Sequence, residues 1–234
     1  ALHLTALFWG ASLTGALSQV LATAALLVSM RRAGFAVGVC TQQSALPLAA
    51  ILGLIGFHDT LRPLAWAGVA ITSGALAVLT WPRQAGGPRP VSGALFGLLS
   101  GLAFGYALNA YRQAATQLDP HHAIFAAVST VCITQTVQTL ALTGLLLMWD
   151  RAALRAVFAA WRQSLAAGLC GALASSCWLT ALALTPAAQV RALGVIEAPI
   201  SALAGRRMFK ERLSLWQWLA GAGAAVGVAM TALG

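Results

Sequence analysis

Eight apolar runs of about 20 residues follow one another along the 234-residue chain, and they constrain its fold more than any other feature. They cover about residues 4–30, 35–57, 63–81, 91–111, 123–148, 163–185, 188–208 and 214–233. A helix of about 20 residues crosses the hydrocarbon core of a bilayer, whereas a barrel strand needs only about half that length. With 59% hydrophobic and 8% charged residues, the composition also excludes a soluble domain, a disordered chain and a fibrous repeat. The sequence therefore predicts an all-α, polytopic transmembrane helix bundle with the lipid bilayer as its partner.

The basic residues lie between the apolar runs and alternate from gap to gap. The first, third, fifth and seventh gaps hold eleven Lys and Arg residues, and the other gaps hold only Arg62, Arg112 and Arg191. The positive-inside rule places the eleven-residue side in the cytoplasm and both ends of the chain outside. Although the net charge is +9, no long basic stretch and no interleaved aromatic residues are present. We therefore expect no nucleic-acid partner.

A linker and an internal repeat organise the chain. Residues 82–92 are rich in Pro and Gly and have no apolar run, so they divide an N-terminal part of three helices, 1–81, from a C-terminal part of five helices, 93–234. Leu46-Pro47, Asp59-Thr60-Leu61 and Trp66 recur about 152 residues later as Ala198-Pro199, Glu211-Arg212-Leu213 and Trp218. The repeated helices are the second and the seventh. Because the seventh span comes five spans after the second, which is an odd number, the two copies cross the membrane in opposite directions, as inverted repeats do.

The second copy of the repeat carries a resemblance to a known family. Val195-Ile196-Glu197-Ala198-Pro199-Ile200, then Phe209-Lys210-Glu211-Arg212-Leu213-Ser214, then Gln217, Gly221 and Gly227, resemble the EamA signature of the drug/metabolite transporter superfamily. The resemblance implies ten helices in two inverted five-helix repeats, and an exporter in a cell inner membrane. On that pattern the first repeat is incomplete, and about two helices, or roughly 50–70 residues at the length of a span, precede the sequence given.

Glu197 is the most informative candidate residue because it lies near the middle of a span that holds no other acid. An ionisable side chain at that depth suits proton coupling or the binding of a substrate amine, but a carboxyl bonded to a neighbouring helix is the alternative. Arg191, six residues earlier, either meets an anionic substrate or snorkels to the membrane surface. Pro47 and Pro199 occupy equivalent places in two spans, where each is expected to kink its helix beside the substrate cavity.

Polar side chains gather around these positions. The expected cavity is walled by the first, second, fourth, sixth and seventh helices, and its remaining candidate residues are Gln19, Gln42, Gln43, Tyr106, Asn109, Ser175 and Trp178. On the fifth span Gln135 and Gln138 accompany a stripe of hydroxyl residues. Each such residue alone is explained by contacts between helices, whereas together they favour a polar path. Gly93, Gly97, Gly101 and Gly105 recur every fourth residue and predict close helix packing.

The motifs of known enzymes are missing. The sequence has no Walker loop, no Gly-x-Ser-x-Gly elbow and no His-Glu-x-x-His, and we expect no catalytic residue, metal or cofactor. The four cysteines lie in apolar segments without Cys-x-x-Cys spacing, so buried thiols are expected. The leading interpretation is a secondary transporter that exports small metabolites or drugs, with protons as one option for coupling. A membrane-embedded enzyme or lipid-handling protein, or a non-transporting scaffold subunit, are the alternatives.

Overall fold

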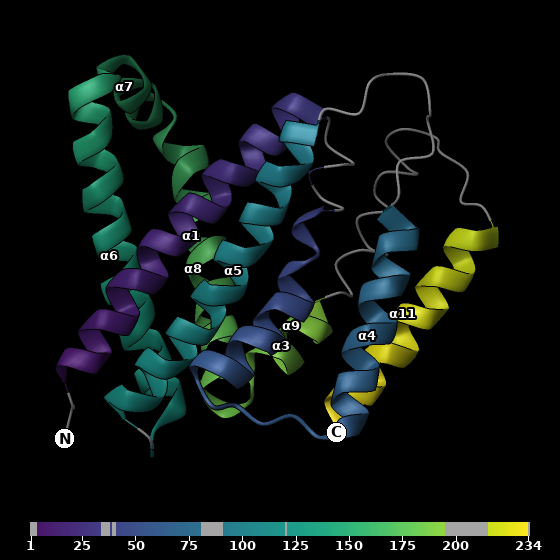
Figure 1. Cartoon of the computed structure of the whole chain (residues 1–234). Helices are drawn as coiled ribbons and strands as arrows, with labels where there is room; N and C mark the ends of the chain where they lie inside the picture. Colours follow the sequence, from purple (N-terminus) through teal and green to yellow (C-terminus); the bar gives the residue numbers. More distant parts are fainter. Residues whose placement is uncertain are drawn as a thin grey trace. The chain divides into compact units, whose positions relative to one another are not determined.

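The computed structural model describes residues 4–33, 38, 41–80, 91–119, 121–194 and 215–233, and this part of the chain is helical without a strand. The helices are α1 (Ala6–Ala33), α3 (Ala45–Gly56), α4 (Pro63–Thr80), α5 (Val91–Leu118), α6 (Ala123–Trp149), α7 (Arg151–Ala159), α8 (Trp161–Leu184), α9 (Ala187–Gly194) and α11 (Leu215–Leu233) (Figure 1). The all-α fold class is therefore confirmed.

Four helices, α1, α5, α6 and α8, are long and apolar enough to cross a membrane, and shorter apolar helices cover 45–56, 63–78 and 222–233. The chain is thus a multi-pass membrane protein. Two expected boundaries were wrong. The helix expected from about residue 91 does begin at Val91, so the linker boundary at 92 was two residues too late, and α5 continues to Leu118 instead of ending near 111. Because a helix stays hydrogen-bonded after it leaves the hydrocarbon, its end need not coincide with the end of the apolar run. Residues 82–90 of the linker lie outside the described part.

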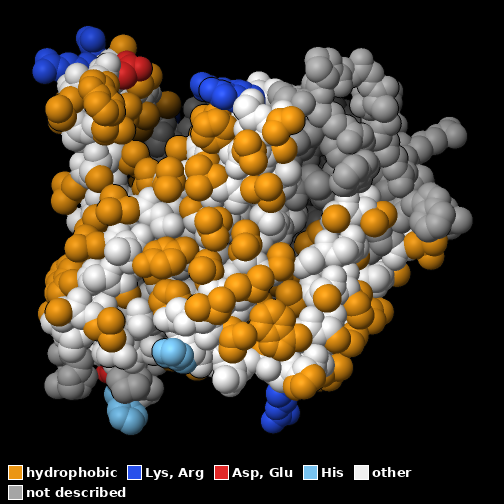
Figure 2. Space-filling view, in the orientation of Figure 1, with side chains coloured by type: hydrophobic (Ala, Val, Ile, Leu, Met, Phe, Trp, Pro, Cys, Tyr) orange, Lys and Arg blue, Asp and Glu red, His pale blue; other side chains and the backbone are white. Residues whose placement is uncertain are grey.

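The helix surfaces carry hydrophobic side chains where a soluble protein would carry charges. Along α8, Leu165, Leu169 and Leu173 form a stripe that is 61–65% exposed. Figure 2 shows hydrophobic side chains over most of the visible helix flanks, and Lys and Arg at helix ends. The expectation of buried thiols was wrong for Cys132, Cys170 and Cys177, which are exposed. In a membrane protein an apolar segment indicates contact with lipid as well as burial, so an apolar neighbourhood does not place a thiol in the core.

The chain divides into two compact units that interleave along the sequence. Unit 1 consists of Ala1–Val20 and Ala110–Thr185, and unit 2 consists of Leu21–Asn109 and Pro186–Gly234. Unit 1 has a small core in which Phe8 of α1 packs with Leu118 of α5 and Ala126 of α6. The expected repeats at 1–81 and 93–234 were assigned from the sequence pattern, whereas these two units are defined by contacts in the structure. The division into repeats therefore stays a prediction.

Unit 2 is built around the crossing of α4 and α11, which lie side by side (Figure 1). Gly68 and Gly227 face each other there, and a Cβ atom built on Gly68 would lie 2.5 Å from the Gly227 carbonyl oxygen. Leu46 and Ala50 of α3 pack with the buried Ala188 of α9 beside this crossing. Small residues let the two backbones approach more closely than larger side chains would permit.

The four glycines of α5 pack as the sequence predicted. Cβ atoms built on Gly93 and Gly97 would collide with Ala33 of α1 and with Thr41, respectively. One built on Gly105 would lie 3.0 Å from the backbone nitrogen of Ala49 in α3. In addition, the Ser29 hydroxyl donates a hydrogen bond to the Gly93 carbonyl at 2.7 Å. This face of α5 therefore fixes the helices of unit 2 that carry most of the candidate residues.

Candidate functional site

The residues expected in one cavity belong to different parts of the structure. Six of them, Gln42, Gln43, Pro47, Tyr106, Asn109 and Arg191, belong to unit 2, and Gln19, Ser175 and Trp178 belong to unit 1. Glu197 and Pro199 lie outside the described residues. The candidate groups are therefore described unit by unit.

The helix expected over 35–57 is interrupted in unit 2. Residues 41–42 are helical, Gln43 and Ser44 form a turn, and α3 starts at Ala45. The expectation that Pro47 kinks the middle of a helix was wrong, because Pro47 lies in the first turn of α3. The first turn of a helix tolerates proline, since its backbone nitrogens have no partner inside the helix. The break itself falls at Gln43 and Ser44.

Arg191 reaches this break from another helix. It lies in the last turn of α9, and its Nη2 atom donates a hydrogen bond to the Gln43 side-chain oxygen at 3.0 Å. Both side chains are half-buried. The two interpretations of Arg191, contact with an anionic substrate and snorkelling to the membrane surface, stay predictions, and the contact found here is with the side chain of Gln43. Two residues proposed from sequence alone, 148 positions apart, thus meet.

Asn109 ties α5 to α3 further along the same packing face. Its buried side-chain nitrogen donates hydrogen bonds to the Ala49 and Gly105 carbonyls, each at 2.9 Å. Its amide oxygen is buried without a partner, and a Cβ atom built on Gly53 would lie 3.0 Å from it. Tyr106, one turn earlier on α5, contacts the ring of Phe57 with the ring centres 6.0 Å apart. Asn109 is thus a packing residue with one unused acceptor.

Unit 1 holds a second polar group, in which three helices meet. The Tyr111 hydroxyl of α5 donates to the Gln19 side-chain oxygen of α1 at 2.6 Å. The Gln138 side-chain nitrogen of α6 donates to the same Gln19 oxygen at 2.9 Å, and it lies 3.2 Å from the Tyr111 hydroxyl. It also reaches the Ala16 carbonyl of α1 at 3.1 Å. Because Tyr111 is only 4% exposed, this network keeps its hydroxyl bonded within the helix bundle.

Sequence reasoning proposed Gln19 and noted Gln138 but missed Tyr111. The candidates chosen on α5 were Tyr106 and Asn109, three residues apart on one face, and Tyr111 lies about 200° around the helix from Asn109. The available signal was the residue type, because the chain has two tyrosines, and a buried tyrosine hydroxyl usually finds a hydrogen-bond partner. Ser175 and Trp178 are half-buried on α8 and are not members of this hydrogen-bonded network.

Arg112 follows Tyr111 on α5 but has a different structural role. Its Nη1 atom donates to the carbonyls of Leu182 and Thr185 at 2.9 and 3.1 Å. Those carbonyls end α8, where the unpaired oxygens and the helix dipole favour a positive charge. Arg112 therefore caps α8, and it lies within a helix and not in a loop.

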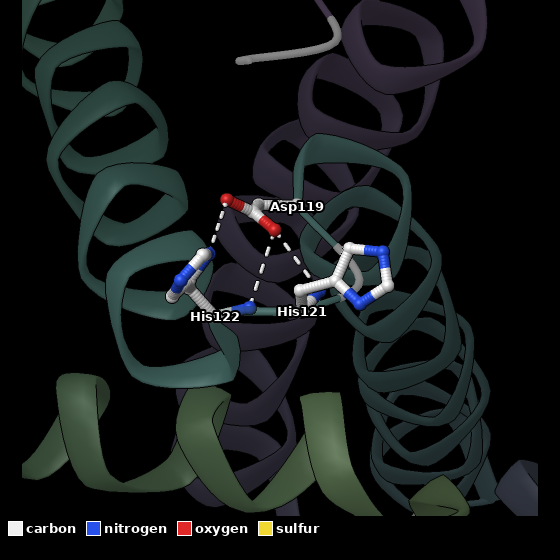
Figure 3. Close-up of polar contacts among 3 residues, drawn as sticks. All are labelled: Asp119, His121 and His122. Atoms are coloured by element: carbon white, nitrogen blue, oxygen red, sulfur yellow. Dashed lines mark hydrogen bonds and ion pairs between the residues drawn. The ribbon is translucent and has the colours of Figure 1, made fainter.

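The turn between α5 and α6 is organised by Asp119 (Figure 3). One carboxylate oxygen accepts backbone N–H bonds from His121 at 2.9 Å and His122 at 3.2 Å, and the other lies 3.0 Å from Nδ1 of His122. The His121 backbone N–H, and after it the His122 side chain, hold the pKa of the Asp119 carboxyl below its ordinary value of 3.8. This arrangement orders the start of α6. No group of three metal-binding side chains occurs among the described residues.

Long apolar helices, lipid-compatible surfaces and polar groups held between helices define a polytopic helical membrane protein. The model of the EamA-like transporter family matches residues 91–233, which is more than half of the chain. The chain belongs to that family and is a membrane transporter. Among curated proteins, none matches it.

Proposed function

We propose that this protein is a secondary transporter that exports small metabolites or drugs across the inner membrane by alternating access, with protons as the coupling ion. The hydrogen bond between Arg191 and Gln43 carries the proposal, because it puts a charged side chain at a break in an apolar helix. Transporters of several folds bind their substrates where discontinuous helices meet. The family match supports transport as such.

The depth of the break also supports a substrate site. The twelve residues of α3 rise about 18 Å from Ala45 to Gly56, and Gln43 lies two residues before them. Measured along the helix axis, this rise is more than half of the thickness of the bilayer core, which is about 30 Å. An ionisable side chain at membrane depth is by default a candidate for function. In this proposal Arg191 binds an anionic group of the substrate, and Gln43 positions the guanidinium.

Proton coupling is proposed for Glu197 from its place in the sequence. A carboxyl in the middle of an apolar span has a protonation state that depends on whether its surroundings are wet or dry. Opening to opposite sides of the membrane would therefore load and release a proton. The Gln19–Tyr111–Gln138 network would hold the helices of unit 1 together while the transporter changes conformation.

The test measures solutes in the medium of cells that produce the intact protein, Arg191→Gln, Glu197→Gln or Arg62→Gln. Arg62→Gln is the matched control because it removes an equal charge from an exposed residue outside the helices. We expect the intact protein and the control to enrich one class of solute outside the cell, and the other two variants to lose that enrichment.

Three outcomes would contradict parts of the proposal. Equal media for the intact protein and an empty vector, despite confirmed membrane insertion, would refute export of cell metabolites and favour the enzyme or scaffold alternatives. If Glu197→Gln exported at the wild-type rate with the same pH dependence in vesicles, Glu197 would have no part in coupling. Wild-type export by Arg191→Gln would remove the substrate role of Arg191.

A further inference from the structure

The short helix α7 was not expected from the sequence, and its position in the chain determines where it lies. It joins α6 to α8, and both of these helices are long and apolar enough to cross a membrane (Figure 1). Only Asp150 separates α6 from α7, and only Ala160 separates α7 from α8. Since neither connection has room for a longer loop, α7 must lie at the membrane surface where α6 ends and α8 begins.

The residues of α7 divide into an apolar sector and a basic sector. At about 100° per residue, Leu154, Val157 and Phe158 fall within a sector of about 100°, and Arg151 and Arg155 fall about 40° apart beside it. None of the α7 residues is buried, and Val157 and Phe158 are 52% and 70% exposed. An exposed helix with this division is suited to lie in the interface, with its apolar sector toward the acyl chains.

Tryptophans mark both ends of this segment. Trp149, the last residue of α6, is 77% exposed, and Trp161, the first residue of α8, is 57% exposed. Tryptophan is enriched at the level of the lipid headgroups because its ring is apolar and its N–H is polar. The Arg162 guanidinium lies 5.4 Å from the centre of the Trp161 ring. A third positive charge therefore lies just after the C-terminal end of α7.

The arginines of this segment have few partners within the described protein. Arg151 and Arg155 donate from Nε to the carbonyls of Leu147 and Arg151, respectively, and neither they nor Arg162 forms an ion pair with a described acid. The nearby carboxylate, Asp150, accepts the Ala153 N–H at 2.9 Å and caps α7. An open hollow of about 530 Å³ at the junction with α8 is lined by Ala156, Ala159, Ala160, Trp161, Arg162 and Gln163. Here basic and apolar groups meet beside an open space.

We propose that α7, with Trp149, Trp161 and Arg162, is an interfacial helix that binds the phosphate headgroups of anionic phospholipids. The arginines complement the negative charge of the headgroup, and the hollow accommodates the headgroup beside Arg162. Phe158 and its apolar neighbours contact the upper part of the acyl chains. A basic side chain near an anionic membrane surface strengthens attraction by about fivefold, so three arginines together set a strong preference for anionic over zwitterionic lipid.

The test uses the full chain in phosphatidylcholine vesicles that contain increasing phosphatidylglycerol. Brominated forms of either lipid quench tryptophan fluorescence on contact, and the signal of Trp149 and Trp161 is isolated by comparison with the double variant Trp149→Phe/Trp161→Phe. We expect brominated phosphatidylglycerol to quench these two residues at several-fold lower content than brominated phosphatidylcholine. In the triple variant Arg151→Gln/Arg155→Gln/Arg162→Gln the two lipids should quench equally.

Two further variants separate lipid binding from a change in fold. The triple Arg→Lys variant keeps the charges and should keep most of the preference. The variant Arg31→Gln/Arg32→Gln removes basic residues from the last turn of α1 and should leave the quenching of Trp149 and Trp161 unchanged. Equal quenching by both lipids in the intact protein, or a preference that survives the triple Arg→Gln change, overturns the proposal. A preference that inorganic phosphate abolishes, while sodium chloride of the same ionic strength does not, would overturn it too, since the site would then bind a free anion.

Discussion

The close approach of α4 and α11 in unit 2 can be tested with a single methyl group. In Gly68→Ala the new Cβ atom would lie 2.5 Å from both the Gly227 carbonyl oxygen and the Thr231 backbone nitrogen. Ordinary van der Waals contact begins at 3.4 Å, so α4 and α11 would have to separate by about 0.9 Å, the difference of the two distances. A gap of 0.5–1 Å removes about a quarter to a half of the dispersion energy of the contacting atoms.

The expected loss follows from comparison with a second glycine of the same helix. A Cβ atom on Gly74 would meet nothing within 4 Å. Both Gly→Ala changes raise helix propensity by the same amount, about 1 kcal/mol, so that contribution cancels in their difference. The difference that is left is the cost of overpacking, about 1–3 kcal/mol. We expect the upper half of that range, because two of the three nearest atoms, the Gly227 carbonyl oxygen and the Thr231 nitrogen, belong to the backbone and cannot rotate away, unlike the third, the Thr231 hydroxyl.

The assay is reversible unfolding in mixed micelles with increasing dodecyl sulfate, followed by circular dichroism. Gly68→Ala should unfold at a clearly lower dodecyl sulfate fraction than Gly74→Ala. The double variant Gly68→Ala/Gly227→Ala should lose less than the sum of the single losses, because one separation of the helices accommodates both methyl groups. Equal free energies of unfolding for Gly68→Ala and Gly74→Ala would refute the close approach of α4 and α11.

Three more predictions use the same unfolding assay. Tyr111→Phe removes the hydroxyl shared by Gln19 and Gln138 and should cost about 0.6–1.7 kcal/mol, as other hydrogen bonds between membrane helices do. Asn109→Ala removes two buried hydrogen bonds and leaves a space beside α3, so it should cost about 1–3 kcal/mol, and an unchanged free energy of unfolding would contradict that role. Asp119 has a lowered pKa, so its contribution is complete above pH 3.8 and is lost as the pH falls through the lowered value. Wild type should therefore exceed Asp119→Asn in stability at pH 7, and the two unfolding curves should converge in strong acid.

The sequence predicted the helical class and the contacts of small residues better than the contacts of polar ones. A glycine every fourth residue on α5 identifies one helix face directly, and that face packs as expected. Polar residues carry less information, because a polar stripe within a span is equally compatible with a cavity, a neighbouring helix or a capping contact. Gln43 and Arg191 were selected from residue type and depth, and their role in a substrate site stays a prediction, but their contact with each other depends on the turn that starts α3 at Ala45. No periodicity in the sequence encodes that turn.

The arginines show why counting charges and locating function are different problems. The expected orientation compares eleven basic residues on one side with Arg62, Arg112 and Arg191 on the other. Two of these three are held inside helices: Arg112 binds the carbonyls that end α8, and Arg191 binds Gln43. Such a guanidinium is positioned by its packing partners. Of these three arginines, only Arg62 is an exposed residue outside the helices. The positive-inside rule rests on charges near the ends of spans. For this chain Arg112 and Arg191 therefore say less about orientation than the basic residues at the ends of the spans, because contacts within the folded protein position both guanidiniums.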